Sequence, residues 1–226
     1  MNSIVENLKE IASSLPEGVK LVAVSKTKPV EAIVEAYEAG QRVFGENRVQ
    51  ELAEKYEVLP KDIEWHMIGH LQTNKVKYMA AFVSLIHGVE SLKLLETIDK
   101  EGKKHDRVIP CLLQFYIASE ETKFGLDMEE AKALLESADY KNMKNVKIVG
   151  VMGMATNTDD EVQVRREFHH LKEIFDELKA TYFAENPEFK ELSMGMSGDY
   201  RIAVEEGSTM VRVGSSIFGA RNYANI

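Results

Sequence analysis

The sequence predicts an α/β protein: a single (β/α)8 TIM barrel with an extra N-terminal helix, forming one domain over residues 1–226. Short β-branched and apolar runs alternate with longer segments of helical periodicity, which is typical of parallel strands joined by right-handed helical crossovers. Eight such runs occur, more than the five or six strands common in a doubly wound open sheet. No linker or low-complexity tract divides the series.

The first segment predicts an amphipathic helix, because Ile4, Leu8 and Ile11 recur at helical spacing. It carries acidic residues and no continuous apolar core, so it is neither a signal peptide nor a membrane span. The predicted strands are 21–25, 42–45, 64–69, 85–89, 109–117, 146–154, 191–196 and 210–218. The predicted helices between them are 30–39, 49–56, 74–82, 91–100, 128–138, 159–183 and 200–206.

Several predicted helix ends carry local signals. Pro29 and Asp127 mark starts, because proline fits the first turn of a helix and an aspartate can cap its free N–H groups. Gly40, Gly102 and Gly207 mark stops, because glycine readily adopts the left-handed conformation found after a helix.

The composition is that of an ordinary soluble globular protein, with 44% apolar and 29% charged residues. A net charge of −9 argues against a nucleic-acid partner, since phosphate backbones need a basic surface.

The single cysteine, Cys111, lies in an apolar run and is interpreted as a buried structural thiol rather than a catalytic one. Absence of a disulfide framework favours the reducing cytoplasm.

Lys26 is the first candidate for chemistry, because it follows a predicted strand at the end where barrels carry their sites. Partial burial there would disfavour the ammonium form, and a neutral amine can attack an aldehyde to form a Schiff base. The alternative is an ordinary lysine whose stem lies along an apolar surface. Lys28 is the nearest competitor, and it is predicted to lie outside the pocket because it immediately precedes Pro29.

Two segments rich in glycine and serine follow the last two predicted strands. Ser197 and Gly198 are predicted at a helix N-terminus, and Gly214-Ser215-Ser216 in a tight turn. Backbone N–H groups and hydroxyls there can converge on a phosphate, which barrels of this class often bind after strands seven and eight. The alternative is a pair of ordinary glycine turns.

Arg212 lies inside an apolar run, where a lone charge is costly unless it is paired. We expect the partner to be a carboxylate such as Glu46, or a ligand. A lysine amine, a phosphate site and a buried guanidinium together fit a flat aldehyde that carries a phosphate, namely pyridoxal 5′-phosphate (PLP).

Histidines could suggest a metal site, and His66, His70 and His87 are the candidates by position. They come from different predicted strands and have no helical spacing to a carboxylate. Packed or hydrogen-bonded histidines are therefore the preferred interpretation, and no metal site is predicted.

Six segments together resemble the pyridoxal phosphate homeostasis protein family, which is related to the N-terminal domain of alanine racemase. They are AVSKTKP (23–29), FGENRVQE (44–51), WHMIGHLQTNK (65–75), ETKFGL (121–126), GVMGMAT (150–156) and LSMGMSGDYRIAVEEGSTMVRVGSSIFGAR (192–221). Two residues depart from the family pattern: His70 stands where many relatives have proline, and Phe124 replaces a small residue.

This resemblance implies a barrel that carries PLP as an internal aldimine on one lysine. The implied cofactor residues are Lys26 for the covalent bond, Ser197, Gly214 and Ser215 for the phosphate, Arg212 for the pyridine nitrogen and Asn47 for the ring pocket. It implies a monomeric cytoplasmic protein that buffers or delivers PLP, with apo PLP-dependent enzymes as recipients and without substantial catalysis.

Two other functions stay open. A racemase-like PLP enzyme is the main rival, although an arginine at the pyridine nitrogen weakens the electron sink that such reactions use. Racemases of this type complete their sites with a second domain and a partner subunit; we expect neither, because the sequence ends at Ile226, soon after the last predicted strand. A class I aldolase, whose barrel lysine attacks a sugar phosphate directly, is the third possibility.

Overall fold

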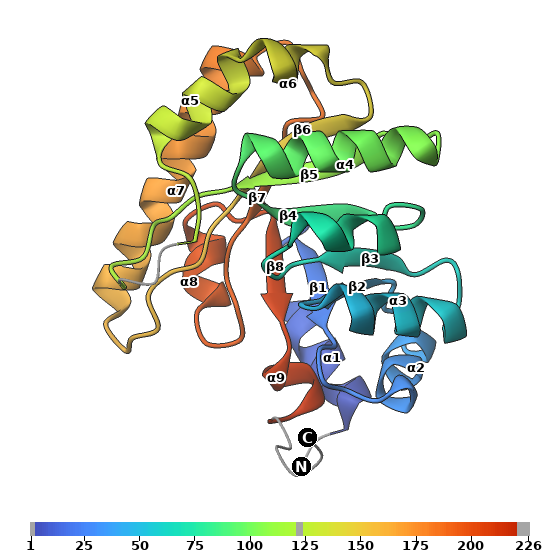
Figure 1. Ribbon diagram of the computed structural model, residues 1–226. Coiled ribbons are helices and arrows are strands. Elements are labelled where there is room, and N and C mark those ends of the chain that lie inside the picture. Colours follow the sequence, from blue (N-terminus) through green and yellow to red (C-terminus); the bar gives the residue numbers. More distant parts are fainter. Residues whose placement is uncertain (1–2, 121–123, 221–226) are drawn as a thin grey trace.

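Parallel strands form a closed barrel in the computed structural model, which describes residues 3–120 and 124–220 (Figure 1). Neighbours along the chain pair in order, and β8 returns to pair with β1. The strands are β1 (Lys20–Val24), β2 (Val43–Glu46), β3 (Glu64–Met67), β4 (Leu85–Val89), β5 (Ile109–Gln114), β6 (Val146–Met152), β7 (Glu191–Ser193) and β8 (Met210–Val213).

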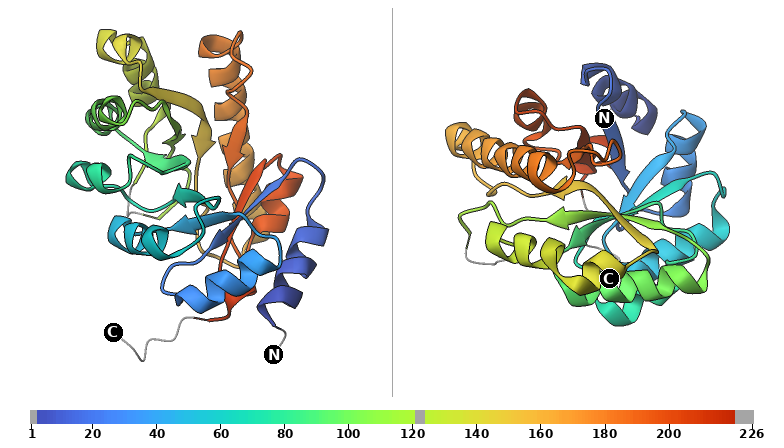
Figure 2. Two further views of the ribbon diagram at one scale, coloured as in Figure 1. Left: turned by 90° about the vertical axis from the view of Figure 1, so that its right-hand side faces the viewer. Right: turned by 90° about the horizontal axis from the view of Figure 1, so that it is seen from above.

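Helices cover the outside of the barrel (Figure 2). Within the described residues they are α1 (Ile4–Ser14), α2 (Val30–Glu38), α3 (Val49–Val58), α4 (Leu92–Lys104), α5 (Met128–Glu136), α6 (Ala138–Asn142), α7 (Glu161–Tyr182), α8 (Tyr200–Glu205), α9 (Ser215–Phe218) and the 3-10 helix η1 (Thr73–Tyr78). The predicted α/β barrel with an additional N-terminal helix is therefore confirmed.

Several predicted element boundaries were wrong, for local reasons. The last predicted strand ends at Val213, because the chain turns at Gly214 into α9. The predicted helix over 128–138 divides at Ser137, whose hydroxyl accepts a hydrogen bond from the Tyr140 N–H and so begins α6. The predicted helix over 74–82 is the 3-10 helix η1.

The prediction that Gly102 stops a helix was wrong, because Gly102 lies inside α4. A Cβ atom there would lie 2.8 Å from the backbone oxygen of Asn145, so the missing side chain lets α4 approach the loop before β6. Gly40 and Gly207 do follow α2 and α8, with φ angles of 105° and 103° that favour glycine.

Two apolar layers hold the barrel together. The large one fills the space between strands and helices and includes Cys111, which is fully buried; burial raises the pKa of its thiol, as expected for a structural cysteine. The small one lies inside the barrel and consists of Val22, Leu85, Leu112, Val149, Met152 and Met210, with Val43 packed against it. Buried polar side chains lie beside this layer, among them His66, His87, Ser193 and Arg212, which are hydrogen-bonded to one another.

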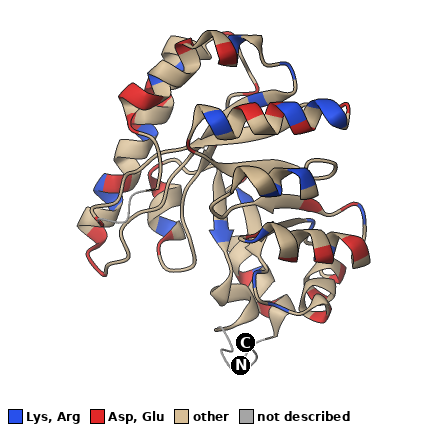
Figure 3. Ribbon diagram, in the orientation of Figure 1, with Lys and Arg blue, Asp and Glu red and all other residues tan. Residues whose placement is uncertain are grey.

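Basic and acidic residues are interspersed over the outer helices, as expected of solvated faces (Figure 3). In the part of the chain that the structure describes, no helix is both long and apolar enough to span a bilayer.

Candidate functional site

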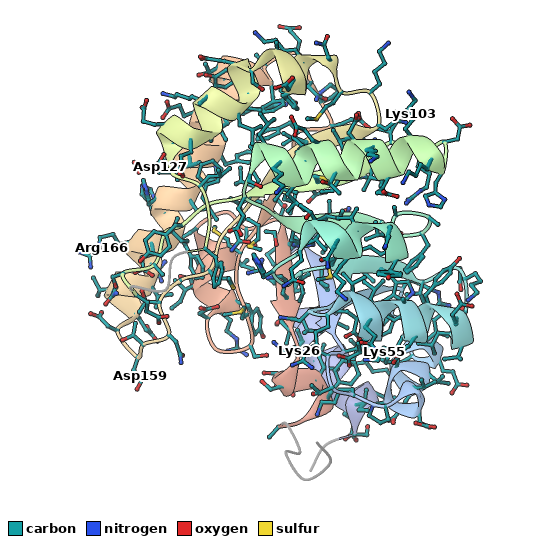
Figure 4. The ribbon with its side chains drawn as sticks, in the orientation of Figure 1. Lys26, Lys55, Lys103, Asp127, Asp159 and Arg166 are labelled. Carbon is teal, nitrogen blue, oxygen red and sulfur yellow. The ribbon has the colours of Figure 1, made fainter. Side chains whose placement is uncertain are left out.

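The turn after β1 carries Lys26 at the carboxyl end of the barrel (Figure 4). Since β1 lies between β8 and β2, this turn has the ends of both strands as neighbours. Lys26 is half-buried, and the next residue, Thr27, has a φ of 62°, an uncommon conformation for a β-branched residue. Such strain persists only where surrounding contacts enforce it.

A buried ion cluster supplies those contacts on both sides of Lys26. Lys55 of α3 donates to the Ser25 carbonyl at 2.7 Å, and the Thr27 N–H donates to Glu51 Oε1 at 2.6 Å. Lys55 also lies 2.6 Å from Glu46 Oε1 and 2.8 Å from Glu51 Oε1. The sequence did not reveal this role, because a lysine on a charged helix predicts a solvent-facing side chain; the only local signal is its spacing of four residues from Glu51.

Glu46 lies at the centre of that cluster. Its Oε1 atom accepts hydrogen bonds from Lys55 and from the Ser25 hydroxyl, the latter at 2.6 Å. Desolvation raises the pKa of Glu46 to about 7, against the opposing effects of Lys55 and Ser25. The expectation that Glu46 compensates Arg212 was therefore wrong: its carboxylate is committed to Lys55.

Lys28 has a structural role elsewhere. Its Nζ atom donates to the carbonyls of Phe218, Gly219 and Ala220 at 3.2, 3.0 and 3.0 Å. These carbonyls lie at and beyond the end of α9, where a cation is favourable. Lys28, the nearest competitor of Lys26, is therefore held by the carbonyls at the end of α9.

The two segments rich in glycine and serine lie together, as their positions at neighbouring strand ends require. The Gly214 N–H donates to Ser197 Oγ at 3.2 Å. The N–H groups of Ser197, Gly198, Ser215 and Ser216 have no acceptor among the described residues. Ser197, Gly198 and Ser216 line a cavity of about 350 Å³ between α8 and α1, so three of these four residues border open space.

Gly214 also lies close to β1. A Cβ atom on it would lie 3.1 Å from the Val24 carbonyl oxygen and 3.2 Å from the Val24 Cβ atom. A side chain here would press on the strand that ends just before Lys26.

Arg212 of β8 is buried, with 3% of its surface exposed. Its NH1 atom donates to Ser193 Oγ, and its NH2 atom donates to the Gly153 carbonyl at 3.2 Å. Within the described residues no carboxylate lies at ion-pair distance from Arg212, although the charge of the more distant Asp199 acts on it. Desolvation lowers the pKa of Arg212 to about 10. A buried guanidinium with only neutral partners is suited to meet a ligand.

Asn47 follows β2, and its Oδ1 atom is buried without a hydrogen-bond partner among the described residues. The backbone of Gly69 packs against it: a Cβ on Gly69 would lie 2.3 Å from the Asn47 carbonyl oxygen. Unpaired buried polar atoms are rare, and Asn47 Oδ1 is one of three among the described residues, with Glu46 Oε2 and Trp65 Nε1.

The histidines are hydrogen-bonded, as the sequence favoured. His66 Nδ1 lies 2.9 Å from His87 Nε2, and His87 Nδ1 lies 2.9 Å from Ser193 Oγ. His70 is separate, with its Nδ1 atom 3.1 Å from Glu90 Oε1. The described residues contain no group of three or more side chains able to hold a metal ion.

The two residues that depart from the family pattern contact each other. The rings of His70 and Phe124 lie 5.1 Å apart. Phe124 also lines a cavity of about 230 Å³ together with Met154 and Met196, which are partly exposed. Residues 121–123 of the ETKFGL segment, and Arg221 at the end of the last segment, lie outside the described residues.

Comparison with known proteins identifies the family. The model for "Alanine racemase, N-terminal domain" matches residues 1–222. A pyridoxal phosphate homeostasis protein of Aquifex aeolicus is 40% identical over 227 residues, which cover 99% of this chain and 97% of that protein. The chain belongs to the pyridoxal phosphate homeostasis protein family.

Several solved structures have the same fold as this chain. PipY of Synechococcus elongatus without PLP matches with a TM-score of 0.87 and 38% identity, covering 96% of this chain and 100% of that one. PipY with PLP bound matches with a TM-score of 0.84 and 37% identity, with the same coverage. Alanine racemase from Bartonella henselae has a TM-score of 0.73 at 17% identity, covering 96% of this chain and 58% of that one, a likeness of fold alone.

Proposed function

We propose that this chain binds PLP covalently through Lys26 and serves PLP homeostasis by holding and releasing the cofactor. The observation that carries the proposal is the arrangement around β8: the Lys26 turn adjoins β8 on one side, and Ser197 contacts Gly214 on the other. PipY, solved with PLP bound, is similar over 96% of the chain. These positions support one PLP site at the carboxyl end of the barrel, with Lys26 as the amine, the backbone N–H groups after β7 and β8 as phosphate donors, and Arg212 as the buried arginine.

The residues present fit the cofactor. The N–H groups of Ser197, Gly198, Ser215 and Ser216, which have no acceptor in the described part of the chain, would hold the phosphate together with the serine hydroxyls. Arg212 uses NH1 and NH2 once each, and the donors that remain would face the pyridine nitrogen. The unpaired Oδ1 atom of Asn47 would lie along the ring.

The chemistry that bound PLP supplies is a carbonyl that condenses with a primary amine, with loss of water, and an electron-accepting ring. Lys26 provides that amine on a turn fixed by Glu51 and Lys55, which keeps the side chain at the barrel mouth. Lys28 is held by backbone carbonyls and does not compete.

The presence of Arg212 favours a role in storing PLP over a role in amino-acid turnover. Its guanidinium only donates hydrogen bonds, so it would pair with an unprotonated ring nitrogen, and a ring in that state would withdraw electrons poorly. A racemase-like enzyme is the rival, since the barrel is shared with alanine racemases. In a class I aldolase, Lys26 would attack the carbonyl of a sugar phosphate. Such a substrate has no pyridine nitrogen for Arg212 to contact.

We further propose that the protein acts as a monomer in the cytoplasm and that its recipients are apo PLP-dependent enzymes. Light scattering of the purified protein measures its molar mass and so tests whether it is a monomer. Incubation of the PLP-loaded protein with an apo-transaminase, followed by measurement of recovered transaminase activity, reports the transfer.

The test of the function is PLP titration of the purified chain, followed by assays with alanine and serine. We expect a visible absorption band that borohydride abolishes, and turnover far below the roughly 1–1000 per second of typical enzymes. Racemase or transaminase turnover in that range, abolished by Lys26→Ala, would establish the rival. Failure to develop the absorption band would remove the PLP proposal and favour the aldolase.

A further inference from the structure

Four buried polar side chains form a hydrogen-bonded chain across the inside of the barrel. Arg212 donates to Ser193, Ser193 Oγ lies 2.9 Å from His87 Nδ1, and His87 Nε2 lies 2.9 Å from His66 Nδ1. None of the four has more than 4% of its surface exposed. They lie beside the apolar interior layer, where polar groups are tolerated only if they satisfy one another.

The proton positions in this chain follow from the donor-only character of arginine. Because Arg212 donates to Ser193 Oγ, the serine hydroxyl hydrogen must find another acceptor. Among the described residues only His87 Nδ1 is in reach, so that nitrogen accepts and Nε2 carries the proton. His87 then donates to His66 Nδ1, and both rings are neutral with the proton on Nε2.

The far end of the chain opens at the base of the barrel. His66 lines a cavity of about 210 Å³ formed by the first residues of several strands, including Lys20, Glu64 and Leu85. Its Nε2 atom has no hydrogen-bond partner among the described residues. The series of hydrogen bonds from Arg212 to His66 therefore runs from the proposed cofactor end of the barrel to the opposite, basal end.

All of these partners are neutral, which matters for Arg212. A carboxylate would fix the guanidinium but would also neutralise it and compete for its N–H groups. A hydroxyl backed by two imidazoles fixes one N–H and leaves the full positive charge. The Gly153 carbonyl fixes a second N–H in the same neutral way.

We propose, resting on the cofactor site above, that Ser193, His87 and His66 are positioning residues that orient the Arg212 guanidinium toward the cofactor ring without neutralising it. Ser193 acts by direct contact, His87 by orienting the serine hydroxyl, and His66 by fixing the His87 tautomer. Positioning of this kind through a second layer of hydrogen bonds is common around cofactors and metals.

Substitutions at His87 separate positioning from packing. In His87→Asn an amide oxygen can take the place of Nδ1 and keep the bond to Ser193, whereas in His87→Gln the amide reaches the place of Nε2 and keeps only the bond to His66. We expect His87→Asn to bind PLP like the parent. His87→Gln, His87→Leu and Ser193→Ala should each weaken PLP binding roughly tenfold, the effect of one lost hydrogen bond to a charged group, and shift the visible absorption band. His66→Leu should shift that band in the same direction, by less.

The matched control is Leu85→Ala, on the same strand and in the apolar interior layer. It should lower stability and leave the absorption band of bound PLP unchanged. Equal behaviour of His87→Asn and His87→Gln, or a band that tracks stability across all variants, would overturn the proposal.

A measurement without PLP keeps this test separate from the proposed function. Nitrogen NMR of the cofactor-free protein should show His66 and His87 as neutral Nε2–H tautomers, and an Arg212 side chain that is rigid in the parent and in His87→Asn but mobile in Ser193→Ala. A protonated His87 Nδ1, or equal Arg212 mobility in the parent and both variants, contradicts the proposed series of hydrogen bonds whether or not PLP binds. Absence of PLP binding by the parent, with the NMR result as expected, contradicts only the proposed function.

Discussion

Lys55 Nζ lies 2.6 Å from Glu46 Oε1, and the two side chains have 7% and 0% of their surfaces exposed. This buried pair lies directly beneath the turn that carries Lys26, since Lys55 also holds the Ser25 carbonyl. Two neighbouring parts of the molecule therefore depend on it: the stability of the barrel wall and the geometry of the proposed attachment site.

Glu46→Gln should change how stability varies with pH. The folded-state pKa of Glu46, about 7, lies above its ordinary value of 4.5, so the folded protein binds this proton more tightly than the unfolded chain. The contribution of Glu46 to stability therefore falls as pH rises from about 4.5 to about 7. We expect the stability of Glu46→Gln relative to the parent to increase by on the order of 2 kcal/mol across this window. Urea unfolding at several pH values measures it, with the exposed Glu54→Gln as control; parallel curves for parent and Glu46→Gln would contradict it.

Lys55→Met should destabilise the protein more than the double variant Lys55→Met/Glu46→Gln. Removing one member of a buried ion pair leaves the other charge uncompensated, at a cost of about 3–5 kcal/mol, whereas replacing both avoids most of that cost. Chemical denaturation at pH 8 compares the two variants. Equal stabilities would show that Glu46 does not depend on Lys55 for its charge.

Acid should destabilise the fold through the interior histidines. Desolvation, with a smaller contribution from Lys20, lowers the pKa of His66 to about 3, below its ordinary value of 6.5. The folded protein thus keeps His66 neutral where the unfolded chain takes up a proton, and stability is lost as pH falls below about 6.5. From pH 6.5 to pH 5 we expect a loss of about 2 kcal/mol from this residue. His66→Gln should reduce that slope, whereas His170→Gln on the exposed face of α7 should leave it unchanged.

Borohydride reduction of the PLP-loaded protein, followed by peptide mass mapping, should place the pyridoxyl group on Lys26. Lys26→Ala should abolish labelling. Lys28→Ala should retain it, because Lys28 is bound to the carbonyls at the end of α9. A pyridoxyl mass on Lys28 or Lys75 would refute the proposed site.

Ser197→Ala and Ser215→Ala should weaken PLP binding and spare pyridoxal, which has no phosphate. Each lost hydrogen bond to a charged group costs about 1.5–3 kcal/mol, so we expect at least a tenfold rise in the Kd for PLP. Fluorescence titration with both aldehydes measures the contrast. Gly214→Val is a poorer probe, since its side chain would also press on Val24. An equal loss for pyridoxal would point to damage elsewhere in the pocket.

Local sequence patterns were enough to predict the α/β barrel, and they put the proposed site residues at the ends of its strands. Apolar runs alternating with helical periodicity, together with end signals such as Pro29 and Gly40, are local properties, and they located the eight strands that residues 3–120 and 124–220 contain. Barrel closure then brings the strand ends together, which is why Ser197 and Gly214, predicted from separate turns, are in contact.

The hydrogen-bond partners of the buried polar groups became visible only in the folded structure. Ser193 and His87 are 106 residues apart, and Lys55 is 30 residues from the carbonyl it holds. No local pattern indicates that Glu46 pairs with Lys55 rather than Arg212, or that Gly102 lies within a helix against Asn145. Periodicity specifies which face of a strand or helix a residue occupies, but a hydrogen-bond partner depends on the register and closure of strands distant in the chain.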